Sequence, residues 1–461
     1  MVEDGAFIAK ARALRPFYFI VVAWGDRYTD FLLNFCIASL LSPNNIPALL
    51  NSGNKFLIAT TDEDWARMQS RPIFQILKQY VEPVFIRIPR PSATSNFCMS
   101  ASMGHKLATH MAYEDRAYGA LLVPDQIVSD GTVASLQRHA VDGYQVVLTA
   151  WLRFGEEPLF EQLKLMGKAT LDSCSGDESR PLTVTGRQLV SAGIRSFHSQ
   201  TACYEWNASY FEPLAAVWWH VPEENGVIVH SLNWAPMLID YDAVEHHDSS
   251  TMDNWTIDGD YIHRNFGLNG KVHVVQDSDE MMLVSFGPLN VGPQSLAPRS
   301  KFATPFIGKW MKELALHETL SNPIFDPLKQ QIFTRPVYWH SRDINQEKWS
   351  TTENEALGII KKINKYRFPK GALEHFMAFN VKSVIKIRDT TIRYKRAIFP
   401  YYDYSYRIYR HIVCIIRIVT RRVGLLLLGN RLALRWWWWR LRKLKSGLAG
   451  QPFPEPQPPA P

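Results

Sequence analysis

The chain has 461 residues, with 51 Lys and Arg against 44 Asp and Glu, a formal net charge of +7. Hydrophobic residues make up 46% and charged residues 21%, which is ordinary globular composition and excludes an intrinsically disordered chain. Five cysteines with no CxxC spacing exclude a disulfide framework or a zinc ribbon, and they predict reduced thiols in a cytosolic compartment.

Apolar runs and stretches of helical periodicity alternate through the first part of the chain. Strands that alternate with helices at this spacing are typical of an α/β fold, with a mainly parallel central sheet and helices on both faces. In such a sheet a ligand lies beyond the carboxyl ends of the strands. We predict strands over residues 17–24, 55–60, 84–88, 120–123 and 145–151, and helices over residues 30–41, 62–79, 100–114 and 133–140.

Polar residues follow the predicted strands. Asp26 and Tyr28 come after the first strand, Asp62 after the second, and Lys106 lies on the helix before the fourth. We predict that these four residues bind a phosphate-containing cofactor or substrate, although Lys106 also fits the charged face of a solvated helix. The chain has neither GxGxxG after its first strand nor GxxxxGK[ST], which disfavours a Rossmann dinucleotide site and a P-loop.

The stretch YGALLVPDQIVSDGT at residues 118–132 places a carboxylate at a strand end. A short apolar run ends at Asp125, and Asp130 follows just before a glycine. A carboxylate at the carboxyl end of a strand suits a metal-bound phosphate, so we predict a functional site at Asp125. An ordinary turn at Asp125 and a helix N-cap at Asp130 are the alternatives.

This order of elements resembles the nucleotide-sugar half of glycosyltransferases with the GT-A fold. The likeness spans residues 17–289, and the motif Pro-Asp-x-x-x-Ser-Asp-Gly at residues 124–131 is similar to that of uncharacterised bacterial glycosyltransferase-like proteins. The resemblance implies a divalent cation, Mn²⁺ or Mg²⁺, that Asp125 would hold against the diphosphate of a nucleotide-sugar donor. Val123 stands where the first Asp of the Asp-x-Asp motif would fall, which departs from a two-carboxylate clamp.

Further candidates lie later in the chain. Transferases of this fold often take a late His as a second metal ligand, so the resemblance implies that role for His230, which follows an apolar strand. A structural His bonded to a backbone carbonyl is the alternative. Asp258 and Asp260 flank a glycine, and as catalytic residues they could bind acceptor hydroxyls or deprotonate one. A capped turn before a helix at Tyr261 is the alternative there.

The C-terminal segment differs sharply from the rest. Residues 381–445 hold 17 basic and 2 acidic residues, which leaves 34 basic and 42 acidic residues elsewhere. Three arginines, Arg417, Arg421 and Arg422, interrupt its apolar runs before about 18 residues, the length of a membrane span. The tryptophans at 436–439 beside basic residues predict an interfacial membrane anchor. A partner-binding arm and a nucleic-acid-binding arm are the alternatives, and the aliphatic runs argue against nucleic acid.

These segments suggest a division of the chain. We predict a nucleotide-sugar-binding half at 1–165, an acceptor-side half at 166–295, a helical extension at 296–380, a basic aromatic tail at 381–445 and a disordered Pro-rich end at 446–461.

Three functions fit the sequence. The first is a membrane-peripheral glycosyltransferase on the cytoplasmic face, acting on a lipid-linked or surface glycan and contacting an anionic membrane through residues 401–445. The second is a non-catalytic protein of the same fold that binds a nucleotide sugar or a partner at the membrane. The third is a phosphoester hydrolase with Asp125 and Asp130 as metal ligands.

Overall fold

A computed structural model of the chain describes residues 2–91, 97–168, 180–208, 211–253, 257, 259–289, 305–322 and 324–367. Asp258, the predicted tail and the Pro-rich end lie outside the described residues, and the expectations about them stay predictions. The chain divides into two compact units, one made of Met1–Arg299 with Ala315–Asn364 and the other of Ser300–Leu314 with Lys365–Pro461. The sites considered below belong to the first unit.

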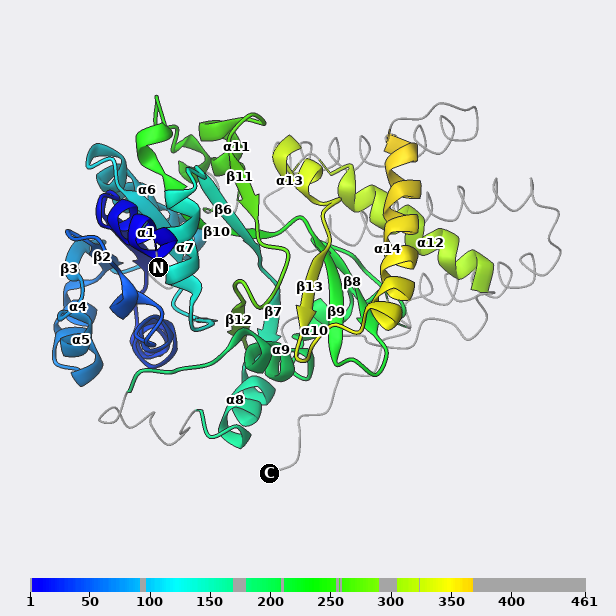
Figure 1. The fold of residues 1–461 in the computed structure, drawn as a ribbon, viewed down its shortest axis with the longest axis horizontal. Helices are drawn as coiled ribbons and strands as arrows, with labels where there is room; N and C mark the ends of the chain where they lie inside the picture. Colours follow the sequence, from blue (N-terminus) through cyan, green and yellow to red (C-terminus); the bar gives the residue numbers. More distant parts are fainter. Residues whose placement is uncertain are drawn as a thin grey trace, which may run out of the picture. The chain divides into compact units, whose positions relative to one another are not determined.

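A seven-stranded sheet forms the centre of this unit (Figure 1). Its strands are β1 (Phe17–Val22), β2 (Lys55–Thr60), β3 (Glu82–Arg87), β4 (Tyr118–Leu122), β6 (Val146–Ala150), β10 (Trp234–Asp240) and β11 (Val272–Val274). They lie in the order β11-β6-β10-β4-β1-β2-β3. β1 pairs in parallel with β2 and β4, as do β2 with β3 and β11 with β6, whereas β10 runs antiparallel to β4 and β6.

The strands at the middle of the sheet are buried on both faces. β1 reads FYFIVV and β4 reads YGALL, and every residue of both strands is buried. Such near-continuous apolar runs are typical of parallel strands covered by helices. The predicted α/β fold, with a mainly parallel central sheet and helices on both faces, is confirmed.

Most of the helices are short, apart from those at residues 97–114, 305–320 and 346–367. They are α1 (Val2–Arg12), α2 (Asp26–Phe31), α3 (Ala38–Leu40), α4 (Asp62–Gln69), α5 (Pro72–Leu77), α6 (Phe97–Glu114), α7 (Thr132–Val141), α8 (Glu156–Leu165), α9 (Gly186–Ile194), α10 (Ser199–Ala202), α11 (Tyr261–Phe266), α12 (Pro305–Leu320), α13 (Pro327–Ile332) and α14 (Gln346–Arg367). A π-helical segment, η1 (Leu32–Ile37), joins α2 to α3, and single 3₁₀ turns are η2 (Ile46–Ala48), η4 (Tyr241–Ala243) and η5 (Ser250–Asp253).

One predicted helix is wrong. Residues 62–79 form two helices, α4 and α5, in place of a single one. Pro72 stands at the first position of α5, and its ring disfavours a helical conformation for Arg71, whose φ and ψ are −85° and 137°. The chain therefore turns there, and α5 packs back against η1.

Two three-stranded sheets flank the central one. The first joins β5 (Gln126–Val128) and β7 (Arg153–Gly155) to β12 (Leu283–Gly287), which pairs antiparallel with β5 and parallel with β7. The second has the order β13-β9-β8, with β8 (Ala216–Val221), β9 (Gly226–Ser231) and β13 (Val337–His340). β13 comes from the stretch predicted as a helical extension, so residues 296–380 contribute a strand as well as helices.

Helix α6 approaches the central sheet closely. A Cβ at Gly104 would come within 2.8 Å of both Val22 and Ala59, so only a glycine allows this contact between helix and strands. Within the described residues, no helix is both long enough and apolar enough to cross a membrane.

His105, next to that glycine, is a buried histidine whose charged form would have no hydrogen bond or counter-charge, among the described residues, to offset its burial. Neither of its ring nitrogens has a hydrogen-bond partner within the described part of the chain, and burial lowers its pKa to about 4. The native state therefore binds no proton there until the pH falls near that value, whereas an unfolded histidine is protonated below about 6.5. The free energy of unfolding is therefore not reduced by His105 above the pKa of the unfolded chain, and it falls as the pH drops from there toward the pKa of the folded protein.

We expect His105→Leu to reduce this pH dependence. Between pH 7 and pH 5 the wild-type protein should lose about 2 kcal/mol of unfolding free energy through His105, and the variant should not. Urea denaturation at both pH values measures the difference. His220→Leu, at an exposed position of β8, is the control and should keep the wild-type dependence. An unchanged pH dependence in His105→Leu would contradict the assignment.

Candidate functional site

The carboxyl ends of β1, β2 and β4 lie at one edge of the central sheet. The three strands are parallel neighbours, so the segments that follow them must meet on the same side. Asp26 and Tyr28 follow β1, Asp62 follows β2, and Asp125 lies between β4 and β5. The arrangement predicted from the sequence, with Asp125 at the end of the fourth strand of the alternating series, is present.

Asp125 is the centre of a group of charged side chains, here called the strand-end cluster: Asp125, Arg27, Arg153 and Glu156. Asp125 is half-buried as a residue, and its backbone carbonyl accepts a hydrogen bond of 3.0 Å from the Phe286 amide. Burial raises the pKa of Asp125, the positive charges of Arg153 and Arg27 oppose that shift, and the negative charge of Glu156 adds to it. Arg27 also forms an ion pair of 2.5 Å with Glu156.

The donor set of this cluster does not fit a divalent cation clamp. Asp125 is faced by two guanidinium groups, Glu156 is paired with one of them, and Val123 brings no oxygen ligand from its side chain. Among the described residues, no group of three possible metal ligands includes Asp125. The positive charge at this edge is therefore supplied by arginines.

His198 lies at the margin of the cluster. Its Nδ1 accepts a hydrogen bond of 3.1 Å from the Gln200 amide, so the proton of the neutral ring is on Nε2. Burial lowers the pKa of His198, and the charge of Arg153 lowers it further. Residues 153, 156 and 198 were not predicted as site residues, although Arg153 and Glu156 stand just after the predicted strand 145–151, where the strand-end rule would have indicated them.

The four residues predicted to bind a phosphate-containing ligand are spread along this edge and over α6. Tyr28 is exposed and meets the Phe31 ring edge-on. The other three form ion pairs of 2.6 Å on the surface, Asp26 with Arg67, Asp62 with Arg87 and Lys106 with Asp253. Surface pairs of this kind contribute little to stability, and a ligand could displace them.

His230 does not join Asp125. It lies on β9, is fully buried, and shares a hydrogen bond of 2.8 Å between Nδ1 and the Phe333 carbonyl. Its ring packs edge-on against Trp219, and burial lowers its pKa to about 4. His230 thus lies in a different sheet from β4 and β5, the two strands that flank Asp125, and it makes the backbone contact that was the alternative.

Two other carboxylates, Asp260 and Asp130, are bound by donors from nearby residues. Asp260 precedes α11 and forms an ion pair of 2.7 Å with Arg264, which with a hydrogen bond to Thr251 holds its pKa low despite burial. Asp130 accepts bonds of 2.9 Å and 2.7 Å from the amide and the side chain of Asn44. Asp130 is therefore tied to a neighbouring loop and does not pair with Asp125.

Asp64, which was not predicted, shapes the turn after β1. It is buried and accepts hydrogen bonds of 2.8 Å from both the Gly25 amide and the Thr61 hydroxyl. Gly25 has a φ of 76°, a conformation that favours glycine. These bonds link the loops after β1 and β2. They therefore fix the start of α2, and with it the position of Arg27 in the first turn of that helix.

We expect Asp64→Ala to destabilise the protein by about 2 kcal/mol, because it leaves the buried Thr61 hydroxyl and the partly buried Gly25 amide without their acceptor. Asp62→Ala is the matched control, since both carboxylates lie in the first turn of α4. Its exposed ion pair should cost less than about 0.5 kcal/mol. Chemical denaturation of both variants measures the difference, and equal losses would argue against the role of Asp64.

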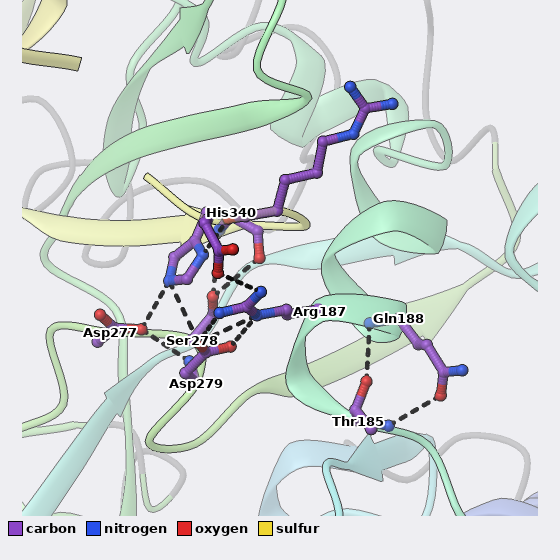
Figure 2. Close-up of polar contacts among 9 residues, drawn as sticks. Thr185, Arg187, Gln188, Asp277, Ser278, Asp279 and His340 are labelled. Atoms are coloured by element: carbon purple, nitrogen blue, oxygen red, sulfur yellow. Dashed lines mark hydrogen bonds and ion pairs between the residues drawn. The ribbon is translucent and has the colours of Figure 1, made fainter. Parts of the chain in front are cut away.

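Two groups of side chains within the described part of the chain could hold a metal ion. Asp277, Asp279 and His340 form the first, shown in Figure 2. There His340 Nε2 lies 2.9 Å from Asp277, and Arg187 binds both carboxylate oxygens of Asp279 at 2.8–3.1 Å. The guanidinium group already neutralises this group, which makes it an ion-pair network. The second group is His139, His273 and Glu280.

Comparisons with known proteins add little. No family model and no curated protein matches the chain. Among solved structures, it is similar to a Bacillus anthracis protein described as a glucose-1-phosphate thymidylyltransferase in complex with a sucrose. The identity is 9%, the TM-score is 0.20, and the match covers 31% of this chain and 57% of that chain. So distant a likeness carries no argument about activity.

Proposed function

We propose that the protein is a transferase that moves a sugar from a nucleotide-sugar donor to a hydroxyl of a lipid-linked or surface glycan. The strand-end cluster is the observation that carries this proposal. It combines one half-buried carboxylate with two arginines at the carboxyl edge of parallel strands, where α/β proteins bind nucleotides. The resemblance of residues 17–289 to GT-A glycosyltransferases points to the same class of donor.

The arginines are suited to the diphosphate of the donor. A guanidinium group binds phosphate oxygens with two parallel hydrogen bonds and keeps its charge at any physiological pH. Within the described residues no ion pair joins Arg153 to a carboxylate, and its charge acts on Asp125 without such a pair, so its guanidinium group can contact a phosphate directly. Arg27 would exchange its contact with Glu156 for a phosphate oxygen. Arg27 lies in the first turn of α2 and Arg153 at the start of β7, so the two arginines come from separate elements, which fits a ligand that bridges them.

Asp125 is suited to accept a proton. Burial raises its affinity for a proton, and a base works best when its pKa lies nearer the working pH. In the proposed reaction the acceptor hydroxyl oxygen bonds to the anomeric carbon of the sugar while the bond to the diphosphate breaks. Asp125 takes the hydroxyl proton, and the negative charge of the leaving diphosphate stays beside Arg27 and Arg153.

Calorimetry on the full chain with a panel of UDP- and GDP-sugars, in EDTA and in Mn²⁺, tests the donor site. We expect one donor to bind the wild-type protein, and Arg153→Gln to weaken that binding by at least about tenfold through the loss of charged hydrogen bonds. Asp125→Asn should keep donor binding and lose sugar transfer. Arg87→Gln is the control, because this arginine lies at the end of β3 outside the cluster, and it should bind like the wild type.

No binding across the panel would overturn the proposal. Donor binding without transfer to any glycan acceptor would favour the second candidate, a non-catalytic protein that binds nucleotide sugars. The observation in favour of that candidate is Val123, which replaces the first carboxylate of the Asp-x-Asp motif.

The membrane-peripheral part of the proposal rests on residues 381–445. Basic residues near an anionic leaflet contribute about 1 kcal/mol each, so binding should require negative lipid and weaken in high salt. We expect the full chain to sediment with phosphatidylserine vesicles at low salt and not with pure phosphatidylcholine vesicles. Equal binding to both vesicle types would contradict an electrostatic anchor.

A further inference from the structure

His139, His273 and Glu280 converge at one end of the central sheet. His139 lies on α7, His273 on β11, and Glu280 in the turn between β11 and β12. Both imidazole Nε2 atoms face the same carboxylate oxygen, at 2.7 Å for His139 and 2.8 Å for His273. The two rings are stacked with their centroids 3.9 Å apart, and the three possible ligand atoms all lie within 4.8 Å of one another.

The three side chains come from elements that hold them in place. β11 pairs in parallel with β6, so that His273 is opposite Val147. α7 packs against β10 of the same sheet. The turn that carries Glu280 is fastened at its end, because Ser129 and Met282 exchange hydrogen bonds of 2.9 Å and 3.0 Å. A site made of such segments is pre-organised for a ligand.

The negative charge of Glu280 is not neutralised by a lysine or arginine among the described residues. Glu280 makes no ion pair with a described lysine or arginine, in contrast to Asp279, which Arg187 binds. Lys271 lies 4.6 Å above the ring of Tyr144, which meets both histidines, and its ammonium group bonds to the Asp142 carbonyl. The side chains of His139, His273 and Glu280 are 13%, 22% and 26% exposed, so the group is partly open to water.

We propose that His139, His273 and Glu280 form a binding site for one transition-metal ion, with Zn²⁺ as the best fit. Two imidazole nitrogens and one carboxylate oxygen are a known set of zinc ligands, and water completes the tetrahedron. Ligand atoms about 2.1 Å from zinc lie roughly 3.4 Å from one another, so the present nitrogen–oxygen distances of 2.7 Å and 2.8 Å need to open by about 0.6 to 0.7 Å. Nitrogen ligands select Zn²⁺ and Co²⁺ over Mg²⁺ and Ca²⁺.

The ion would join α7 to the turn before β12. This position lies outside the strand-end cluster, so the site does not depend on the proposed transfer reaction. β12 pairs with β5, and its Phe286 amide holds the Asp125 carbonyl. Zinc at this position would therefore stabilise the strand that supports the cluster, as a structural ion and without contact with substrate.

Titration of the EDTA-treated full chain with Zn²⁺ and with Co²⁺ tests the site. We expect one equivalent of either ion to bind with a rise in the thermal unfolding midpoint, and Mg²⁺ at the same concentration to do neither. Bound Co²⁺ should show the visible absorption of a tetrahedral complex without the ultraviolet band of a thiolate ligand, which separates this site from the five cysteines. A wild-type chain that binds no Zn²⁺ would overturn the proposal.

Substitutions locate the ion. His273→Gln and Glu280→Gln should each weaken Zn²⁺ binding at least about tenfold and remove the rise in unfolding midpoint. His340→Gln is the matched control, since it changes a buried histidine in the ion-pair network of Figure 2 and should leave Zn²⁺ binding unchanged. Loss of binding in His340→Gln alone would place the ion in that network instead. If His273→Gln does not fold, His139→Gln on α7 gives the same test.

Discussion

Parallel hydrogen bonding of β1 with β2 and β4 is the interaction on which the other features depend. Strands buried on both faces must be apolar throughout, so polar side chains can enter only where each strand ends. Because the strands run in one direction, their carboxyl ends place Arg27, Asp62 and Asp125 along one edge. β7 brings Arg153 to the same place, because the chain continues directly from the end of β6.

The carboxylates considered at the candidate site divide into two kinds. Asp64, Asp130 and Asp260 are held by specific donors, and each joins two pieces of backbone or closes an ion pair. No side-chain donor bonded to the Asp125 carboxylate is found among the described residues, and burial together with the charge of Glu156 raises its pKa against the charge of two arginines. A group whose charge is poorly compensated is the one free to respond to a ligand, which is why the proposed chemistry centres on it.

The turn between β11 and β12 links several parts of the fold. Asp277 contacts His340 and Asp279 contacts Arg187, as Figure 2 shows. Glu280 contacts His139 and His273 instead. Charged contacts thus hold the turn on two sides, and β12 follows it to support Asp125 through the Phe286 amide. The backbone at the strand-end cluster is positioned by residues far from it in the sequence.

The sequence by itself determined the α/β class, the approximate positions of strands β1, β2, β3, β4 and β6, and the position of Asp125 at a strand end. Those features follow from apolar periodicity and turn residues over about ten positions. Only the tertiary structure decided which side chains meet. Arg27 pairs with Glu156, 129 residues away, and His139 with Glu280, 141 residues away. The antiparallel insertion of β10 between β4 and β6 also escaped prediction, since strand order is set by packing over the whole chain and leaves no local signal.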